Sequence, residues 1–125
     1  MAAHNDLGAL GEQIALDYLL EHDYIILETN WVCGHKEIDI IAKDGDTIVF
    51  VEVKTRKAPV LVDPEATVDV FKQRLLIYAA NSYVNRFQYD FDVRFDIIAI
   101  VIDNNNEKRI EHIVDAFYPS YKNLR

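Results

Sequence analysis

The hydrophobic positions of this 125-residue chain change their spacing from one segment to the next, and the spacing predicts the secondary structure. Across residues 7–22 they recur every three to four positions, which is typical of an amphipathic helix, here with Asn5 or Asp6 as its N-cap. We expect this helix to bury one apolar stripe formed by Leu7, Leu10, Ile14 and Tyr18 and widened by Leu16, Leu19 and Leu20.

Three β-rich runs follow, over 24–33, 35–42 and 47–55. The first is predicted to kink or turn near Thr29-Asn30. The second and third are separated by Asp44-Gly45, which is a strong signal for a tight turn between two strands. The central part of the chain is therefore predicted to contain an antiparallel hairpin.

The second half of the chain predicts one helix and two strands. Asp63 and Pro64 are suited to open a helix that continues to about Asn85, with an apolar face of Val68, Phe71, Leu75, Tyr78 and Ala79. Apolar residues then fill consecutive positions over 94–102, which favours a strand buried on both faces, and a last strand is expected near 109–114. The order α-β-β-β-α-β-β predicts one α/β domain over 1–125, with a mixed central sheet flanked by helices.

The composition is that of a globular protein, since half of the residues are hydrophobic and 27% are charged. No apolar run approaches the roughly 20 residues that cross a bilayer, and the N-terminus has neither a basic start nor an apolar signal core. Cys33 is the only cysteine, which rules out an internal disulfide and a multi-cysteine zinc site. We expect a cytoplasmic protein with no membrane association.

The net charge of −8 argues against a passive nucleic-acid coat, because such proteins are usually basic. The charge is unevenly distributed. Residues 1–50 contain ten acidic and two basic side chains, which gives −8, whereas residues 51–125 contain eleven of each. The acidic half is either a solvated surface or a set of carboxylates that binds a cation.

The predicted hairpin carries charges where apolar residues are usual. With Asp44 and Gly45 as the central turn residues, Asp39 pairs with Phe50 and Glu37 pairs with Glu52. Side chains alternate between the two faces of a strand, so the register places four charged residues on one face: Glu37, Asp39, Glu52 and Lys54. It makes Asp39 and Glu52 diagonal neighbours whose side chains can converge.

Three carboxylates on one patch repel one another, and Lys54 supplies only one positive charge. A hard divalent cation such as Mg²⁺, which is commonly held by one or two carboxylates, would neutralise the patch. The alternative is a solvent-facing cluster neutralised by Lys54 and water. If repulsion dominates, Asp39→Asn or Glu52→Gln should keep or slightly raise the stability of the metal-free protein.

Glu12 is a further acidic residue with an unusual setting. Small and apolar residues surround it on the first helix, which indicates that it faces the protein rather than water. It is then a candidate partner of the carboxylate patch and its cation. Alternatively, Glu12 lies on the shoulder of the helix and reaches solvent.

The series EIDIIA, a turn and FVEVKTR resembles the Asp…Glu-x-Lys core of the restriction-endonuclease-like nuclease superfamily. More closely, the chain resembles the YraN-like family, which is similar in turn to archaeal Holliday-junction resolvases. The blocks that carry the resemblance cover most of the chain, and besides the hairpin they are GEQIALDYLLEHDYIILETNW, PEATVDVFKQRL and RFDIIAI. The chain departs from the family at Lys36, where a glycine usually precedes the Glu of the EID block.

The resemblance implies a restriction-endonuclease-like core and an endonuclease that uses Mg²⁺ or Mn²⁺ to hydrolyse DNA, including branched or junction DNA. Asp39 and Glu52 would be metal ligands, joined by the carbonyl of Val53 and by Glu12, and Lys54 would be the catalytic lysine. Either Lys72 or Gln73 would occupy a polar position near the site. Like the resolvases, the protein would act as a homodimer.

The basic residues after the hairpin are candidates for binding the nucleic-acid backbone, namely Arg56 and Lys57 in the loop and Lys72 and Arg74 on the second helix. Taken singly, each is also an ordinary surface charge. Two other functions stay open: a nucleic-acid-binding module with this fold that does not cut, and an acidic interaction domain without a nucleic-acid role.

Other chemistries find no support in the sequence. The four histidines lack metal-ligand spacing, and no glycine-rich phosphate-binding loop is present. Neither the serines nor Cys33 lies in a recognisable nucleophile turn. Zinc enzymes, nucleoside triphosphatases and serine or cysteine hydrolases are therefore disfavoured.

Overall fold

A computed structural model describes residues 3–59, 68–87 and 92–117, with side chains from residue 6 onward. Two helices and five strands follow the predicted order α-β-β-β-α-β-β. Their bounds are α1 Ala3–Glu21, β1 Ile25–Cys33, β2 Lys36–Asp44, β3 Thr47–Lys57, α2 Val70–Val84, β4 Asp92–Ile102 and β5 Lys108–Phe117.

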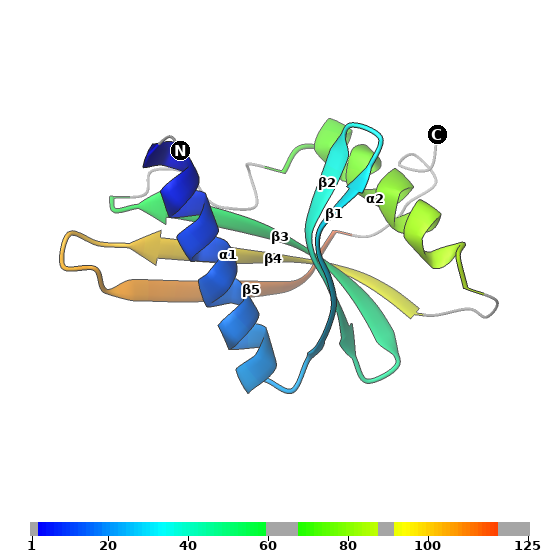
Figure 1. Ribbon diagram of the computed structural model, residues 1–125, viewed down its shortest axis with the longest axis horizontal. Coiled ribbons are helices and arrows are strands. Elements are labelled where there is room, and N and C mark those ends of the chain that lie inside the picture. Colours follow the sequence, from blue (N-terminus) through cyan, green and yellow to red (C-terminus); the bar gives the residue numbers. More distant parts are fainter. Residues whose placement is uncertain (1–2, 60–67, 88–91, 118–125) are drawn as a thin grey trace.

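The five strands of the described residues form one mixed sheet in the order β1-β2-β3-β4-β5. Among these strands only β3 and β4 run parallel, and α2 provides the crossover that a parallel pair requires. The other neighbours are antiparallel. In Figure 1, β3, β4 and β5 lie side by side while the β1–β2 hairpin rises steeply across them, with its tip beside α2. The predicted α/β architecture is confirmed.

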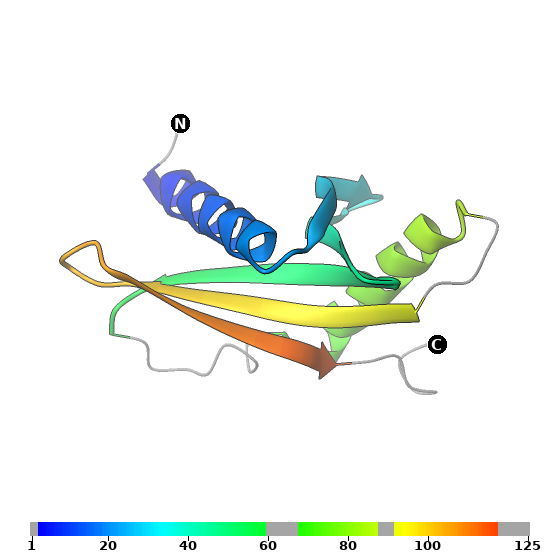
Figure 2. The same ribbon diagram turned by 90° about the horizontal axis from the view of Figure 1, so that it is seen from below.

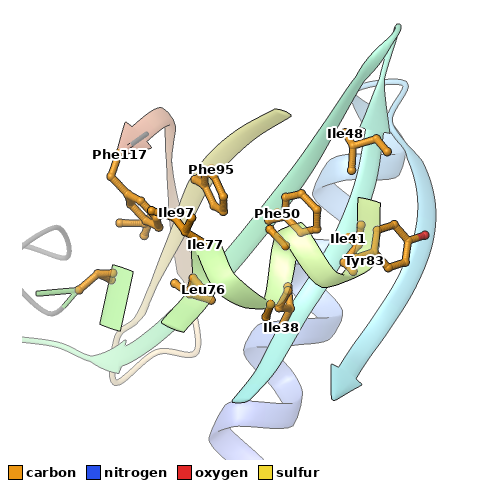
Figure 3. Packing of buried hydrophobic residues seen from close by; sticks show 13 residues of the cluster. Ile38, Ile41, Ile48, Phe50, Leu76, Ile77, Tyr83, Phe95, Ile97 and Phe117 are labelled. Atoms are coloured by element: carbon orange, nitrogen blue, oxygen red, sulfur yellow. The ribbon is translucent and has the colours of Figure 1, made fainter. Parts of the chain in front are cut away.

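Each face of the sheet buries its own apolar cluster. On one face α1 contributes Ile14, Ala15 and Leu19, which pack with alternating residues of the strands, including Val49, Val51, Ile98 and Ile100. Figure 2 shows α1 lying over this face. On the other face α2 packs against Ile48, Phe50, Phe95 and Ile97 (Figure 3). Both faces are covered along β3 and β4, so the prediction that the strand over 94–102 is buried on both sides is confirmed.

The predicted apolar faces of both helices need correction. On α1 the buried positions are Gly11, Ile14, Ala15 and Leu19, whereas Leu10 is 50% exposed. On α2, Phe71 and Tyr78 are 70% and 69% exposed. The predicted Ala79 is buried, and the other buried positions are Leu76, Ile77, Ala80 and Tyr83, which the prediction did not include. Each helix carries two apolar stripes at helical spacing, and only packing against the sheet selects between them.

The start of α2 also differs from the prediction. Asp63 and Pro64 lie outside the described residues. Asp69 is the N-cap, with extended backbone dihedrals and a carboxylate that accepts the N–H of Lys72 at 2.9 Å, so the helix begins at Val70. Val68, just before the cap, is buried as expected.

The hairpin turn lies one residue later than predicted. Asp44 pairs with Thr47 and Ile41 pairs with Phe50, so the central turn residues are Gly45 and Asp46. Gly45 has φ +60°, a value that glycine adopts without strain and that the first central position of a type II′ turn requires. The predicted partners of Asp39 and Glu37, which were Phe50 and Glu52, are therefore wrong.

We predict that Gly11→Ala destabilises the protein by about 1–3 kcal/mol, because a methyl group there overpacks a tight contact. A Cβ on Gly11 would lie 1.8 Å from Oγ1 and 2.8 Å from Cβ of Thr55, so α1 would have to move away from β3. Gly8 is the matched control on the same helix, since a Cβ there meets nothing within 4 Å. Thermal unfolding should show Gly8→Ala neutral or stabilising, and equal melting temperatures for the two variants would contradict the prediction.

Candidate functional site

The β1–β2 hairpin leaves the sheet at Asp39 and opens a notch between β2 and β3. The β2–β3 pairs run from Asp44↔Thr47 to Ile40↔Val51 and end there. The β1–β2 pairs continue to Cys33↔Lys36, and the β3–β4 pairs continue to Lys57↔Ile102. The separation of the two strands explains the steep rise of the hairpin in Figure 1. Asp39 and Glu52 border the notch.

Asn30 lies where the hairpin changes direction. Its φ of +49° lies in the left-handed region, which asparagine tolerates better than most residues. The pairs on either side of it face opposite ways, because Ile40 packs in the cluster under α1 while Ile38 and Trp31 pack in the cluster under α2. The predicted kink near Thr29-Asn30 is confirmed, and it twists the hairpin at the position of Asp39.

The Asp39 side chain takes the place of the missing strand partner. Its Oδ2 accepts the backbone N–H of Val53 at 2.8 Å. The N–H and C=O of a strand residue point to the same edge of the strand, so the Val53 carbonyl also faces the notch. Burial, the negative charge of Glu52 and a side-chain hydrogen bond with Glu52 raise the pKa of Asp39 to about 7, although the Val53 N–H opposes the shift. The two carboxyl groups thus converge, and Asp39 is the member of the pair whose pKa rises.

Glu52 lies on β3, is 5% exposed, and contacts three lysines. Its Oε2 is 2.8 Å from the Nζ of Lys72, 3.7 Å from that of Lys54 and 3.9 Å from that of Lys36. Burial alone would raise the pKa of Glu52, but the Lys72 hydrogen bond and the three positive charges outweigh burial and hold it below its usual range. Glu52 is therefore the ionised member of the carboxylate pair.

Lys54 shares the face of Glu52 and its side chain is 14% exposed. Burial, together with its hydrogen bond to Lys72 and the charge of that ammonium, lowers the pKa of Lys54 to about 8, while Glu52 opposes the shift. The Lys54 amine can therefore change protonation near neutral pH, a property that suits a group in direct contact with a reacting phosphate.

Glu12 and Glu37 are brought together by Asn30. The Nδ2 of Asn30 donates to Oε1 of Glu12 at 2.7 Å and to Oε1 of Glu37 at 3.1 Å. Glu12 lies close enough to Asp39 for its charge to raise the Asp39 pKa further. Glu37 is exposed and pairs with Val32, so its predicted position beside Glu52 is wrong. The reason is the later turn, which shifts every residue of β2 relative to β3.

Of the predicted nucleic-acid-binding residues, one contacts the carboxylate pair and the others lie elsewhere. Lys72 is part of the site through Glu52. The Nε2 of Gln73 donates to the carbonyl of Val68 and so supports the start of α2. Arg56 is exposed and donates to the carbonyl of Thr55, and Lys57 and Arg74 are exposed. In the part of the chain that the structure describes, none of these last three forms an ion pair or hydrogen bond with the carboxylate pair.

Sequence reasoning missed two residues of the site. Lys36 contacts Glu52, and its only signal was that it replaces the glycine usual in the resembling family. Asn30 holds Glu12, and its signal was the kink predicted at its position. Neither residue belongs to the hairpin pattern of alternating charges, so that pattern did not reveal them.

A second polar cluster, distant in the chain from the hairpin charges, is centred on Asp96 of β4. Asp96 is fully buried, and four hydrogen bonds reach its carboxylate: two from Arg94 at 2.9 Å, one with His112 at 2.7 Å and one from the Asp115 N–H at 3.0 Å. Tyr18 of α1 joins His112 at 3.1 Å. These contacts connect α1, β4 and β5. The sequence feature that could have revealed them is the single aspartate within the apolar run over 94–102.

The notch offers oxygen donors, the type that Mg²⁺ and Mn²⁺ prefer. Among residues 3–59, 68–87 and 92–117, no group of three or more His, Cys, Asp and Glu side chains is arranged to hold a metal ion. The donor set for a cation is therefore the carboxylate pair, with the Val53 carbonyl on the same edge. The pair fits a divalent cation by the chemistry of its donors, because two carboxyl groups and a backbone carbonyl are all oxygen ligands.

We predict that Asp39→Asn raises the stability of the metal-free protein by about 1–3 kcal/mol at pH 8. An amide keeps an acceptor for the Val53 N–H, but it removes a buried negative charge that Glu52 repels. Because the folded-state pKa of Asp39 is raised, its stability contribution is lost as pH rises through about 7, and the variant lacks this loss. Chemical denaturation in EDTA at pH 5 and pH 8 should show a larger gain at pH 8 than at pH 5, because the loss develops between about pH 4 and pH 7.

The same expectation does not hold for Glu52→Gln, because Glu52 neutralises part of a lysine cluster instead of adding to repulsion. Removing one member of such a pair leaves buried charge without compensation. We therefore expect Glu52→Gln to lower the stability of the metal-free protein. This replaces the prediction that both substitutions act alike.

The described helices include none whose length and apolar character would allow it to cross a membrane. Comparison with known proteins identifies the relatives of the chain. It is 48% identical over 119 residues to a UPF0102 protein of Bacteroides thetaiotaomicron, covering 95% of this chain and 98% of that protein. It is 47% identical to UPF0102 proteins of Parabacteroides distasonis and Flavobacterium psychrophilum, covering 94% of this chain in both cases and 97% and 98% of those proteins.

The family model matches residues 11–100, a span that begins at the tightly packed Gly11 and contains the notch, α2 and most of β4. With this match and relatives that align over nearly their whole length, the chain belongs to the uncharacterised protein family UPF0102.

Proposed function

We propose that the protein is a Mg²⁺- or Mn²⁺-dependent endonuclease that hydrolyses phosphodiester bonds of DNA, including branched or junction DNA. The observation that supports this proposal is the convergence of Asp39, Glu52 and Lys54 at a break in the sheet. A backbone edge and two largely buried carboxyl groups border the break, and a lysine with a pKa of about 8 lies beside them.

Asp39, Glu52 and the Val53 carbonyl would hold the cation, with Glu12 nearby on α1. When bound, a divalent cation lowers the pKa of water and polarises the phosphate. The residues of the chain supply the rest. Lys54 holds the attacking water or neutralises charge on the phosphate, because its ammonium lies on the same face as Glu52. Asn30 keeps Glu12 oriented toward the notch.

A nucleic-acid-binding module without catalysis is the second candidate, and one contact favours it. Lys72 lies 2.8 Å from Glu52, so one of the two carboxylates already has a charge partner. A site that keeps this ion pair binds phosphate without binding a cation. Binding that depends on salt but yields no product with any metal would support this alternative.

The test is incubation of the protein with four-way junction, flap, duplex and single-stranded DNA in Mg²⁺ or Mn²⁺, followed by gel analysis of product. We expect cleavage by the wild type and none by Asp39→Ala. Gly8→Ala is the folded control, because its substitution lies at an open position of α1. Equal cleavage by wild type and Asp39→Ala would overturn the assignment of the site.

A further inference from the structure

Three lysines from three different elements converge on one buried carboxylate. Lys36 begins β2, Lys54 lies on β3 and Lys72 lies in the first turn of α2. Their side chains are 18%, 14% and 30% exposed, and their Nζ atoms lie within 4 Å of the same Glu52 oxygen. Long basic side chains are rarely this buried unless they are paired. This group of three is called the lysine cluster below.

The lysine cluster has more positive charge than Glu52 alone can neutralise. Among the described residues, the three ammonium groups form their ion pairs with this one carboxylate oxygen, so a single negative charge is shared among three positive charges. Charge held away from water is costly unless it is compensated. An additional anion at the notch would supply that compensation. The excess is notable in a chain whose net charge is −8.

The distances show which lysines have donors to offer. Lys72 hydrogen-bonds Glu52 at 2.8 Å, whereas Lys54 and Lys36, at 3.7 and 3.9 Å, form ion pairs that are too long for hydrogen bonds. Glu52 therefore does not use the hydrogen-bond donors of Lys36. Because residues 36–39 of β2 are not paired with β3, Lys36 borders the notch from β2 while Lys54 borders it from β3.

We propose that Lys36 is a phosphate-binding residue, and that with Lys72 and Lys54 it binds a backbone phosphate of a nucleic-acid strand. The inference rests on the proposed function in taking a polynucleotide as the ligand. In the free protein Glu52 holds the lysine cluster together, and the arriving phosphate competes with Glu52 for its donors. Lys36 thus contributes to affinity for the strand whether or not a metal ion is bound.

The first experiment measures binding without metal, so that it does not depend on cleavage. Fluorescence anisotropy follows a labelled single-stranded oligonucleotide in EDTA at a series of salt concentrations. Lys36→Met, which keeps the apolar stem, should weaken binding about tenfold and reduce the salt slope by about 0.7, the value for one lost phosphate contact. Lys36→Arg should retain the slope.

Lys43→Met is the matched control, because Lys43 is on the same strand but pairs with Ile48 at the far end of the hairpin. It makes the same change in net charge and should leave the salt slope as in the wild type. If Lys36→Met and Lys43→Met bind equally, the inference is wrong. If Lys36→Met alone loses affinity while the wild type never cleaves DNA, the inference stands and the proposed catalysis falls.

The second experiment tests the competition with Glu52. Glu52→Gln removes the competing anion, so in EDTA it should bind the oligonucleotide about tenfold more tightly than the wild type. Weaker or unchanged binding by folded Glu52→Gln would show that the phosphate does not compete with Glu52 for the lysine donors. A parallel titration with inorganic phosphate identifies the source of the anion. If Lys36→Met loses affinity for free phosphate but not for the strand, the polynucleotide assignment is wrong.

Discussion

Lys54→Met is expected to reduce DNA cleavage by about 10²–10³-fold while leaving metal binding intact, the loss typical of removing one preorganised electrostatic group. Lys54 is not an oxygen donor and does not belong to the set that would hold a cation. Its ammonium contacts Glu52 at 3.7 Å and faces the notch from β3. Its loss removes charge stabilisation without removing either carboxylate.

Asp39→Asn differs from Lys54→Met because it should lose both DNA cleavage and metal binding. Calorimetric titration with Mn²⁺ separates the two variants. Lys54→Met should give a binding heat like that of the wild type, whereas Asp39→Asn should give none. Lys43→Met, with the same change in charge at a distant position of β2, should cleave normally. Full cleavage by Lys54→Met would remove Lys54 from the catalytic role.

Asp96→Asn is expected to destabilise the protein by about 3–5 kcal/mol at pH 7, the cost of breaking a buried charge pair. Asp96 is fully buried, and the amide cannot accept all four hydrogen bonds that the carboxylate receives. The Arg94 guanidinium would lose its main buried partner, although Asp44 still contacts it at 3.0 Å. Denaturant unfolding at pH 7 measures the effect.

Asp92→Asn is the control on the same strand, since Asp92 is exposed, and it should change stability by less than about 0.5 kcal/mol. The pH dependence gives a second readout. Burial would raise the pKa of Asp96, but the His112 and Arg94 hydrogen bonds outweigh burial and lower it. A lowered pKa stabilises the fold above about pH 4 and loses that contribution as pH falls further. The difference between wild type and Asp96→Asn should therefore narrow below pH 4.

The hydrophobic pattern predicted the kind and order of the elements because each element has a distinct period. It could not predict which side of each helix packs against the sheet. Phe71 and Tyr78 form as regular a stripe as Leu76, Ala80 and Tyr83, and only the tertiary packing separates the two. The hairpin register failed for a local reason: Gly45 occupies the first central turn position, not the second.

The candidate site illustrates the same limit. Asp39 and Glu52 do converge, but a continuous ladder with the predicted register does not bring them together. They meet because the later turn makes them the next facing positions after Ile40↔Val51, where the ladder ends and the Asp39 side chain accepts the Val53 N–H instead. The ladder ends close to where Asn30, on a third strand, adopts its positive φ, and residue spacing within the hairpin does not show this. The contact between Lys36 and Glu52 arises from the same break, so local spacing could not reveal it.

The hydrogen bond from the Val53 N–H to Asp39 gives residue 39 a mechanical role besides any chemical one. The side-chain oxygen of residue 39 occupies the place of a main-chain acceptor and so keeps β2 and β3 from pairing there. A hydrocarbon side chain of similar size cannot accept the Val53 N–H. That N–H would then need a main-chain acceptor, and pairing between β2 and β3 could extend across the notch. Variants that keep an oxygen at residue 39 therefore test its role in catalysis alone. Asp39→Val would also test whether the notch between β2 and β3 is retained.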